Sequence, residues 1–157
     1  MSLAKAQLRF SLLDGYGLKA LFLGGEGLLS RSVRAMLTHN DLCVHMRADP
    51  EAFLAECRRG GCRYDFILVD ADRFGGPAAL YDRLRRMRAL APGAALVLLS
   101  AEFERDEYGT HRLYLADVSL TVPVMLHALE LGLLQASVNN TKWRRRADEA
   151  RALEIAS

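Results

Sequence analysis

Residues 64–76, with the sequence YDFILVDADRFGG, determine how the rest of the chain is read. Four apolar residues in a row, Phe66 to Val69, are typical of a strand that is buried on both faces in a parallel sheet covered by helices. The run stops at Asp70, so a carboxylate stands at the carboxyl end of a strand, where ligands collect in open parallel sheets. Two interpretations of Asp70 are open at this point: a functional carboxylate, or a cap for the segment that follows.

The rest of the chain alternates predicted strands with predicted helices. Apolar runs predict the strands, and apolar residues at helical spacing between Gly and Pro turns predict the helices. The strands are expected at residues 18–23, 42–46, 66–69, 94–99 and 117–121, and the helices at 28–37, 50–59, 77–90 and 124–134, with a charged, weakly helical segment at 102–112. This alternation predicts an α/β fold in which a parallel sheet lies between two layers of helices.

Length and composition narrow the class of protein. The chain has 157 residues and a hydrophobic fraction of 51%, which suits one domain with a real core. Its net charge of +2 comes from residues 142–157, which hold five basic and three acidic residues, so the body is neutral and unlike a dedicated nucleic-acid binder. No apolar segment approaches the ~20 residues that a membrane span needs.

The cysteines indicate a reducing compartment. Cys43, Cys57 and Cys62 make an odd number in a chain without a recognisable signal peptide, which predicts a cytoplasmic protein. Cys57 and Cys62 match no second pair of metal ligands, so we expect them to be core or loop thiols.

The stretch 64–76 resembles the third strand of the receiver domains of two-component signalling, whose pattern is roughly Tyr-Asp-x-x-Leu-x-Asp followed by a loop with Gly. In that family the last Asp accepts a phosphoryl group, and Asp70 stands at its position. Ser100 matches the hydroxyl residue that hydrogen-bonds the phosphoryl group, and Pro123 matches the proline after the fifth strand. Because residues 18–135 follow the whole pattern, the resemblance implies a flavodoxin-like, doubly wound sheet with strand order 2-1-3-4-5.

The sequence departs from the receiver pattern where the chemistry lies. Receivers bind Mg²⁺ with two neighbouring acids after the first strand, but Gly24 and Gly25 stand there, and only Glu26, one residue late, could replace part of the pair. Val122 stands where the family has a Lys before the proline, and Ser119 stands near the family's aromatic position. Phosphoryl transfer depends on positioning and charge stabilisation, which glycine and valine side chains do not supply. The resemblance therefore implies a degenerate, non-catalytic receiver, or pseudo-receiver, without a cofactor or bound Mg²⁺.

A dinucleotide-binding turn is the alternative function. Gly25-x-Gly27-x-x-Ser30 follows a strand and opens a helix, which is close to the fingerprint Gly-x-Gly-x-x-Gly/Ala. Such glycines would let a pyrophosphate approach the helix N-terminus, with Arg47 and Asp49 placed to read a ribose. Against this alternative, the chain offers no substrate domain and no recognisable set of catalytic residues.

We divide the chain into a lead-in linker (1–17), a receiver-like domain (18–138) and a helical tail or linker to a neighbouring domain (139–157), with a frayed tail as the alternative. The segment 15–19 resembles the linker ahead of receivers in hybrid sensor histidine kinases, so such a kinase is the first expected parent and a response regulator the second. The arginines of the third helix are expected on a solvated basic face: Arg83, Arg85, Arg86 and Arg88.

The last strand and helix predict association with proteins. Apolar residues go round most of the helix at 124–134, so they cannot all face one core. We expect a homodimer through residues 117–134 with Trp143 at or near the contact, or else a monomer whose tail covers this surface. The tail's expected apolar stripe is Trp143, Ala147, Ala150 and Leu153.

Overall fold

The structure is a computed structural model that describes residues 17–110 and 115–156. The lead-in expected at residues 1–17 thus lies outside the described residues, apart from Gly17. The elements in chain order are β1 (Lys19–Leu23), α2 (Leu28–His39), β2 (Cys43–Arg47), α3 (Pro50–Gly60), β3 (Phe66–Asp70), the 3-10 helices η1 (Ala71–Phe74) and η2 (Ala78–Leu80), α4 (Tyr81–Leu90), β4 (Ala95–Ser100), β5 (Val118–Thr121) and α5 (Leu126–Ala156).

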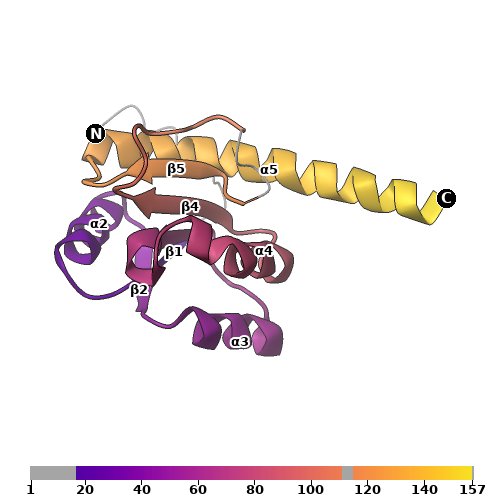
Figure 1. Ribbon diagram of the computed structural model, residues 1–157, viewed down its shortest axis with the longest axis horizontal. Helices are drawn as coiled ribbons and strands as arrows, with labels where there is room; N and C mark the ends of the chain where they lie inside the picture. Colours follow the sequence, from indigo (N-terminus) through magenta and orange to yellow (C-terminus); the bar gives the residue numbers. More distant parts are fainter. Residues whose placement is uncertain (1–16, 111–114, 157) are drawn as a thin grey trace.

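All five strands run parallel in one sheet, in the order β2-β1-β3-β4-β5 (Figure 1). This order confirms the predicted flavodoxin-like fold. The central strand β3 pairs with β1 and β4, and its residues Phe66 to Val69 are at most 1% exposed, as expected for a strand covered on both faces.

Alternate side chains along each strand enter two separate cores, because successive residues of a strand point to opposite faces of the sheet. On one face, α2 and α5 pack against Phe22, Phe66 and Leu68. On the other face, α3 and α4 pack against Leu21 and Ile67. The result is the expected three-layer sandwich.

Two local predictions differ from the structure. The segment 101–110 contains turns and bends instead of a weak helix, and its Glu107 forms an antiparallel bridge with Ser119 of β5. Glu107 exchanges two backbone hydrogen bonds with Ser119 of β5, and the Asp106 carboxylate accepts the backbone N–H of Thr121 at 2.8 Å, so this segment bonds to β5 instead of forming a helix. The third helix does not begin as an α-helix at Pro77: η2 comes first and α4 follows at Tyr81.

The last helix, α5, is continuous from Leu126 to Ala156 and runs through the position where we divided domain from tail. Its first half packs on the sheet, and its second half extends away from the body (Figure 1). No helix within residues 17–110 and 115–156 is both long and apolar enough to cross a membrane.

Candidate functional site at the carboxyl edge of the sheet

The carboxyl ends of the three central strands bring the predicted site residues together. Asp70 ends β3, Gly24 follows β1, and Ser100 ends β4, which pairs with β3. Asp70 is half-buried and Ser100 is fully buried. Asp70 therefore lies at the edge where ligands collect in this fold class.

The surroundings of Asp70 disfavour its charged form. Burial raises the pKa of the Asp70 carboxyl above its ordinary value, and the charge of Asp72 acts in the same direction. The backbone N–H groups of Arg73 and Asp72 and the charge of Arg73 act in the opposite direction, but burial prevails.

Other side chains stand close to both glycines at the positions of the receiver acids. A Cβ at Gly24 would lie 2.8 Å from the Asp70 Cβ and 2.8 Å from the buried ring of Phe22. A Cβ at Gly25 would lie 2.7 Å from Nε of Arg73. The Arg73 side chain thus occupies the space in which a side chain of residue 25 would stand, and it places a cation there.

These side chains do not fit a Mg²⁺ ion. Mg²⁺ needs oxygen ligands in octahedral geometry, whereas the space over Gly25 holds a guanidinium. Glu26 is exposed, and no group of three His, Cys, Asp or Glu side chains within the described part of the chain is arranged to hold a metal. We therefore derive no chemistry through a metal at this edge.

Asp72, which the sequence analysis did not assign a role, engages the hydroxyl of Ser100. The Ser100 Oγ donates a hydrogen bond to Asp72 Oδ1 at 2.6 Å, and the backbone N–H of Ala101 donates to Asp72 Oδ2 at 2.8 Å. The same Ser100 Oγ accepts the N–H of Glu102 at 3.0 Å. The hydroxyl that the resemblance assigns to a phosphoryl group therefore already binds a carboxylate of this chain.

Val122, at the position that the resemblance assigns to a lysine, is an apolar residue with apolar neighbours. Val122 is half-buried against the core that α2 and α5 cover, and its backbone N–H donates to the carbonyl of Ser100 at 3.2 Å. The bond between Val122 and Pro123 is cis. Ser119, near the family's aromatic position, is buried on β5.

The turn considered for a dinucleotide is closed by its own hydrogen bonds. Gly27 N–H donates to Ser30 Oγ at 2.9 Å, and Ser30 Oγ donates to the Gly27 carbonyl at 2.9 Å. The two residues considered for a ribose also have other partners: Arg47 pairs with Glu56 at 3.3 Å, and Asp49 caps α3. With Arg73 over Gly25, the turn lacks the open approach that a pyrophosphate requires.

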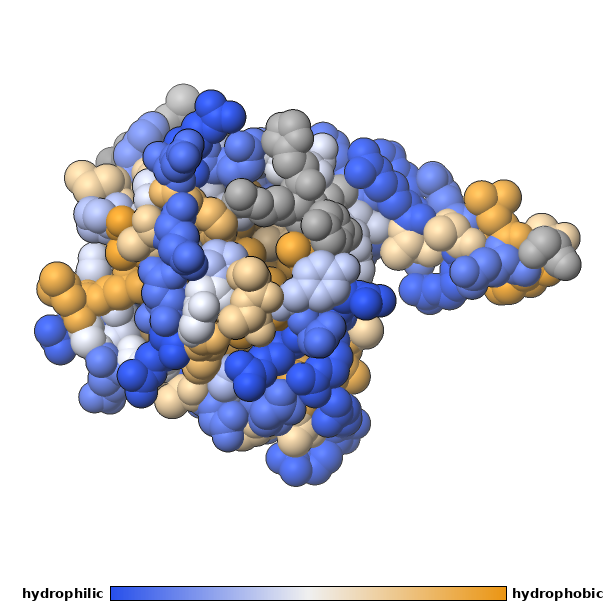
Figure 2. All heavy atoms as spheres, viewed as in Figure 1, coloured by the Kyte–Doolittle hydropathy of each residue, from blue (hydrophilic) through white to orange (hydrophobic). Residues whose placement is uncertain are grey.

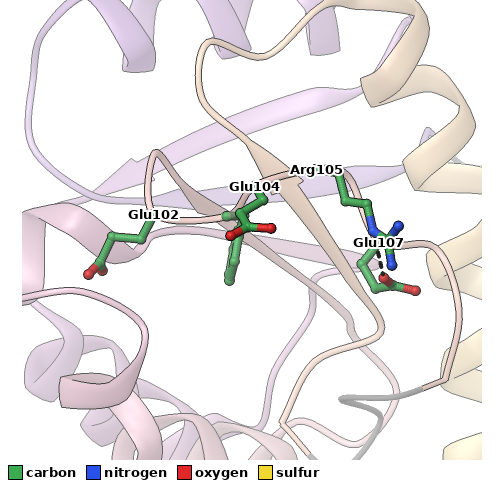
Figure 3. A pocket seen from close by; sticks show the side chains of 5 residues that line it. Glu102, Glu104, Arg105 and Glu107 are labelled. Carbon is green, nitrogen blue, oxygen red and sulfur yellow. Dashed lines mark ion pairs between the residues drawn. The ribbon is translucent and has the colours of Figure 1, made fainter.

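An acidic pocket lies on the connection between β4 and β5, next to this edge (Figure 3). The side chains of Glu102, Glu104, Arg105 and Glu107 line it, and Arg105 pairs with Glu107 at 4.0 Å. The carboxylate of Glu102 also lies against Gly76, on the loop after β3.

A second cluster of polar residues, which the sequence analysis missed, ties α4, β5 and α5 together. Arg88 donates to both carboxylate oxygens of Asp117 at 2.8 and 2.9 Å, with side-chain exposures of 3% and 0%. The expectation of a solvated basic face is thus wrong for Arg88. A buried arginine needs a carboxylate partner, which only the fold could bring next to it.

Helix α5 contributes the other half of this cluster. The Trp143 ring lies 4.4 Å from the Arg88 guanidinium. The Asn139 amide donates to the Asp117 carbonyl at 2.8 Å, and the Asn140 amide donates to the Pro92 carbonyl at 3.1 Å. Both asparagines are buried, so the contact between α5 and the body extends past residue 138 to Trp143.

Comparison with known proteins finds similar structures. No protein-family model matches the sequence, and no curated protein sequence matches it. The signal receiver domain of an HD domain-containing protein from Pseudomonas fluorescens Pf-5 is 16% identical, with a TM-score of 0.62 over 85% of this chain and 96% of that chain.

Two further structures show the same likeness. The receiver domain of a sensor histidine kinase from Pseudomonas aeruginosa PAO1, with a magnesium ion coordinated in its active site cleft, is 22% identical, with a TM-score of 0.60 over 78% of this chain and 98% of that chain. The beryllofluoride-activated receiver domain dimer of NtrC4 is 12% identical, with a TM-score of 0.59 over 78% of this chain and 98% of that chain. At these identities the likeness concerns the fold, and the chain has the flavodoxin-like fold of response regulator receiver domains.

Proposed function

We propose that this chain is a receiver-like signalling domain that acts through protein contacts and does not accept a phosphoryl group. The observation that carries this proposal is the occupation of the site by the chain itself: Arg73 fills the space over Gly25, and Asp72 binds the donors of Ser100 and Ala101. The fold supports the signalling role, and the site geometry supports the loss of chemistry.

The physical reason is that phosphoryl transfer depends on placed charges. A reaction at Asp70 needs cations and donors that stabilise the developing charge on the phosphoryl oxygens. Here Val122 supplies no charge, and a phosphoryl group on Asp70 would have to displace Asp72 from Ser100. The raised pKa of Asp70 also favours the protonated carboxyl, which is not the nucleophilic form.

Treatment with phosphoramidate or acetyl phosphate in the presence of Mg²⁺ tests this proposal. We expect intact-mass spectrometry to show no added phosphoryl group, with Asp70→Asn as the matched control and an active receiver domain as the positive control. A stable addition of one phosphoryl group to the natural chain but not to Asp70→Asn would overturn the proposal.

We further propose that the parent protein is a cytoplasmic hybrid sensor kinase or response regulator, and that this domain forms a homodimer. Helix α5 supports the association because it exposes Leu131 (40%) and Val138 (50%), and Met125, just before the helix, is 66% exposed. Of the apolar residues expected on the surface of 117–134, the core buries Leu120, Val124, Leu129 and Leu133. Trp143 stacks on Arg88, so we now place the contact away from Trp143.

Multi-angle light scattering over a concentration series tests the association. A mass that rises from one chain to two chains with concentration supports the homodimer. A mass of one chain at the highest soluble concentration would restrict the domain to contacts with other proteins.

A further inference from the structure

On its outer side, α5 carries a regular row of exposed residues that the proposed signalling role does not explain. The row is spaced alternately by three and four residues, which is the spacing of a coiled-coil seam. All six members are exposed: Val138, Thr141, Arg145, Asp148, Ala152 and Ile155.

The row lies on the side of α5 that faces away from the domain. The opposite side holds the residues that contact the body or lie closest to it, Ala136, Asn139, Trp143 and Ala147, at positions about half a turn away. A partner on the row would therefore meet no part of the chain's own sheet. Figure 1 shows that the second half of α5 stands clear of the body.

The protruding half of α5 needs a partner to be stable. A helix of this length in water is marginal without packing of an apolar face. Along this half, Leu153 and Ile155 are 73% and 84% exposed, and the space-filling view shows orange hydrophobic surface near the C-terminal end (Figure 2). The apolar ends of the row, Val138 and Ile155, are the anchors that an occupant would cover.

The charges along the row indicate which partner helix fits it and whether the two helices run parallel or antiparallel. In a parallel pair of two copies, Arg145 would face Arg145 of the partner subunit and Asp148 would face Asp148 of the partner subunit. In an antiparallel pair, Arg145 meets Asp148 of the partner subunit twice by symmetry. Opposite charges across such a seam stabilise pairing and like charges oppose it, so the row is self-complementary in the antiparallel direction only.

We propose that the outer row of α5 binds the same row of a second copy of this chain, antiparallel, about a twofold axis between residues 146 and 147. This inference rests on the proposed homodimer and specifies its surface. In this arrangement Val138 packs on Ile155 of the partner subunit, and Thr141 packs on Ala152 of the partner subunit. To form this contact, Asp148 would give up its ion pair with Arg151. That pair is weak, because it spans 3.9 Å between two exposed side chains.

The arrangement also settles where the two bodies lie. Since α5 leaves each domain at about residue 143, an antiparallel overlap of residues 138–155 places the two domains at opposite ends of the paired helices. The interface is isologous, so it closes at two copies and does not propagate. Such a contact would fix the distance between two signalling domains.

Charge exchange tests the pairing. We expect Arg145→Asp and Asp148→Arg each to weaken the dimer about tenfold, since each places like charges together at two symmetric positions. The double variant R145D/D148R should restore the natural affinity, because it only exchanges the signs. Arg146→Asp is the matched control: it makes the same change of charge at an exposed position off the row and should leave the affinity unchanged.

Disulfide cross-linking tests the direction, on the full chain with the exposed Cys43 replaced by Ser. We expect T141C mixed with A152C to form a cross-linked heterodimer under mild oxidation, and T141C alone to form none. Self-cross-linking of T141C would overturn the antiparallel direction, and a dimer that cross-links in neither experiment would overturn the row as the interface. A monomer in light scattering would instead remove the homodimer itself, so failures of the two proposals are distinguishable.

Discussion

The molecule places arginine near aspartate in two regions that differ in solvent exposure. At the carboxyl edge of the sheet, Arg73 and Asp72 are exposed and lie beside a half-buried Asp70. At the junction of α4, β5 and α5, Arg88 and Asp117 are buried and joined by two hydrogen bonds, and Asp117 also accepts the N–H of Leu96 at 2.7 Å. The same residue types line the carboxyl edge of the sheet in one region and join elements of the fold in the other.

The difference teaches that burial decides what a charged pair does. In water, the attraction between two charges is offset by their hydration and by the freedom of long side chains. In the interior, each charge depends on its partner because no water can replace it. Burial raises the pKa of Asp117, while the hydrogen bonds and the charge of Arg88 act in the opposite direction. We therefore expect substitutions to be costly at the junction and inexpensive at the edge.

The largest effect is expected at Arg88. The substitution Arg88→Met keeps the stem of the side chain but leaves Asp117 buried without its partner, so the free energy of unfolding should fall by about 3–5 kcal/mol. Urea denaturation followed by circular dichroism measures this change. The control Arg85→Met lies on the exposed side of the same helix and should cost less than about 0.5 kcal/mol. Equal costs for the two variants would show that the buried pair does not support the junction.

An intermediate effect separates the two glycines of the edge. Gly24→Ala would press a Cβ on the buried Phe22 ring and on Asp70, so we expect a loss of about 1–3 kcal/mol. Gly25→Ala meets only the exposed, flexible side chain of Arg73, which can swing into solvent, and should change stability by less than about 0.5 kcal/mol. Thermal and urea denaturation of both variants measure the difference. A costly Gly25→Ala would mean that Arg73 is held in place more firmly than its exposure implies.

The smallest effect concerns the protonation of Asp70. The pKa of the Asp70 carboxyl is raised in the folded state, so the folded chain favours the protonated form. The contribution of this protonation to the free energy of unfolding is fully present below the pKa of the unfolded chain, about 3.8. It is lost as the pH rises through the pKa of the folded chain. Asp70→Asn removes the charged form, and we expect it to make the domain slightly more stable than the natural chain at neutral pH. The two curves of stability against pH should converge at acidic pH. If Asp70→Asn is less stable at neutral pH, Arg73 stabilises the carboxylate more than burial destabilises it.

The strand order could be predicted from sequence because it depends on repeated local patterns. The run Phe66 to Val69 indicated a buried strand, and the β-α alternation indicated a parallel sheet, while the resemblance supplied the order that the structure confirms. The meeting of Asp70, Gly24 and Ser100 at one edge followed from the same alternation, since the carboxyl ends of parallel strands share an edge.

The sequence shows the residues that occupy this edge but does not predict which residues they contact. Asp72 and Arg73 stand in the stretch 64–76, yet their contacts depend on which strand ends lie next to η1. Asp72 reaches Ser100 across 28 positions of sequence, and Arg73 covers Gly25. Such contacts depend on the distance between β1, β3 and β4, which no local pattern reports.

The sequence by itself therefore determined the α/β architecture and the absence of side-chain carboxylates at Gly24 and Gly25, because hydrophobic periodicity and residue chemistry are local properties. Only the tertiary structure decided that Arg88 is buried against Asp117, that Trp143 faces the body, and that the outer row of α5 is exposed. Both α4 and α5 carry arginines and apolar residues, so the sequence of each helix is compatible with more than one buried face. The choice among them depends on which partner groups the sheet presents, and that is a property of the assembled fold.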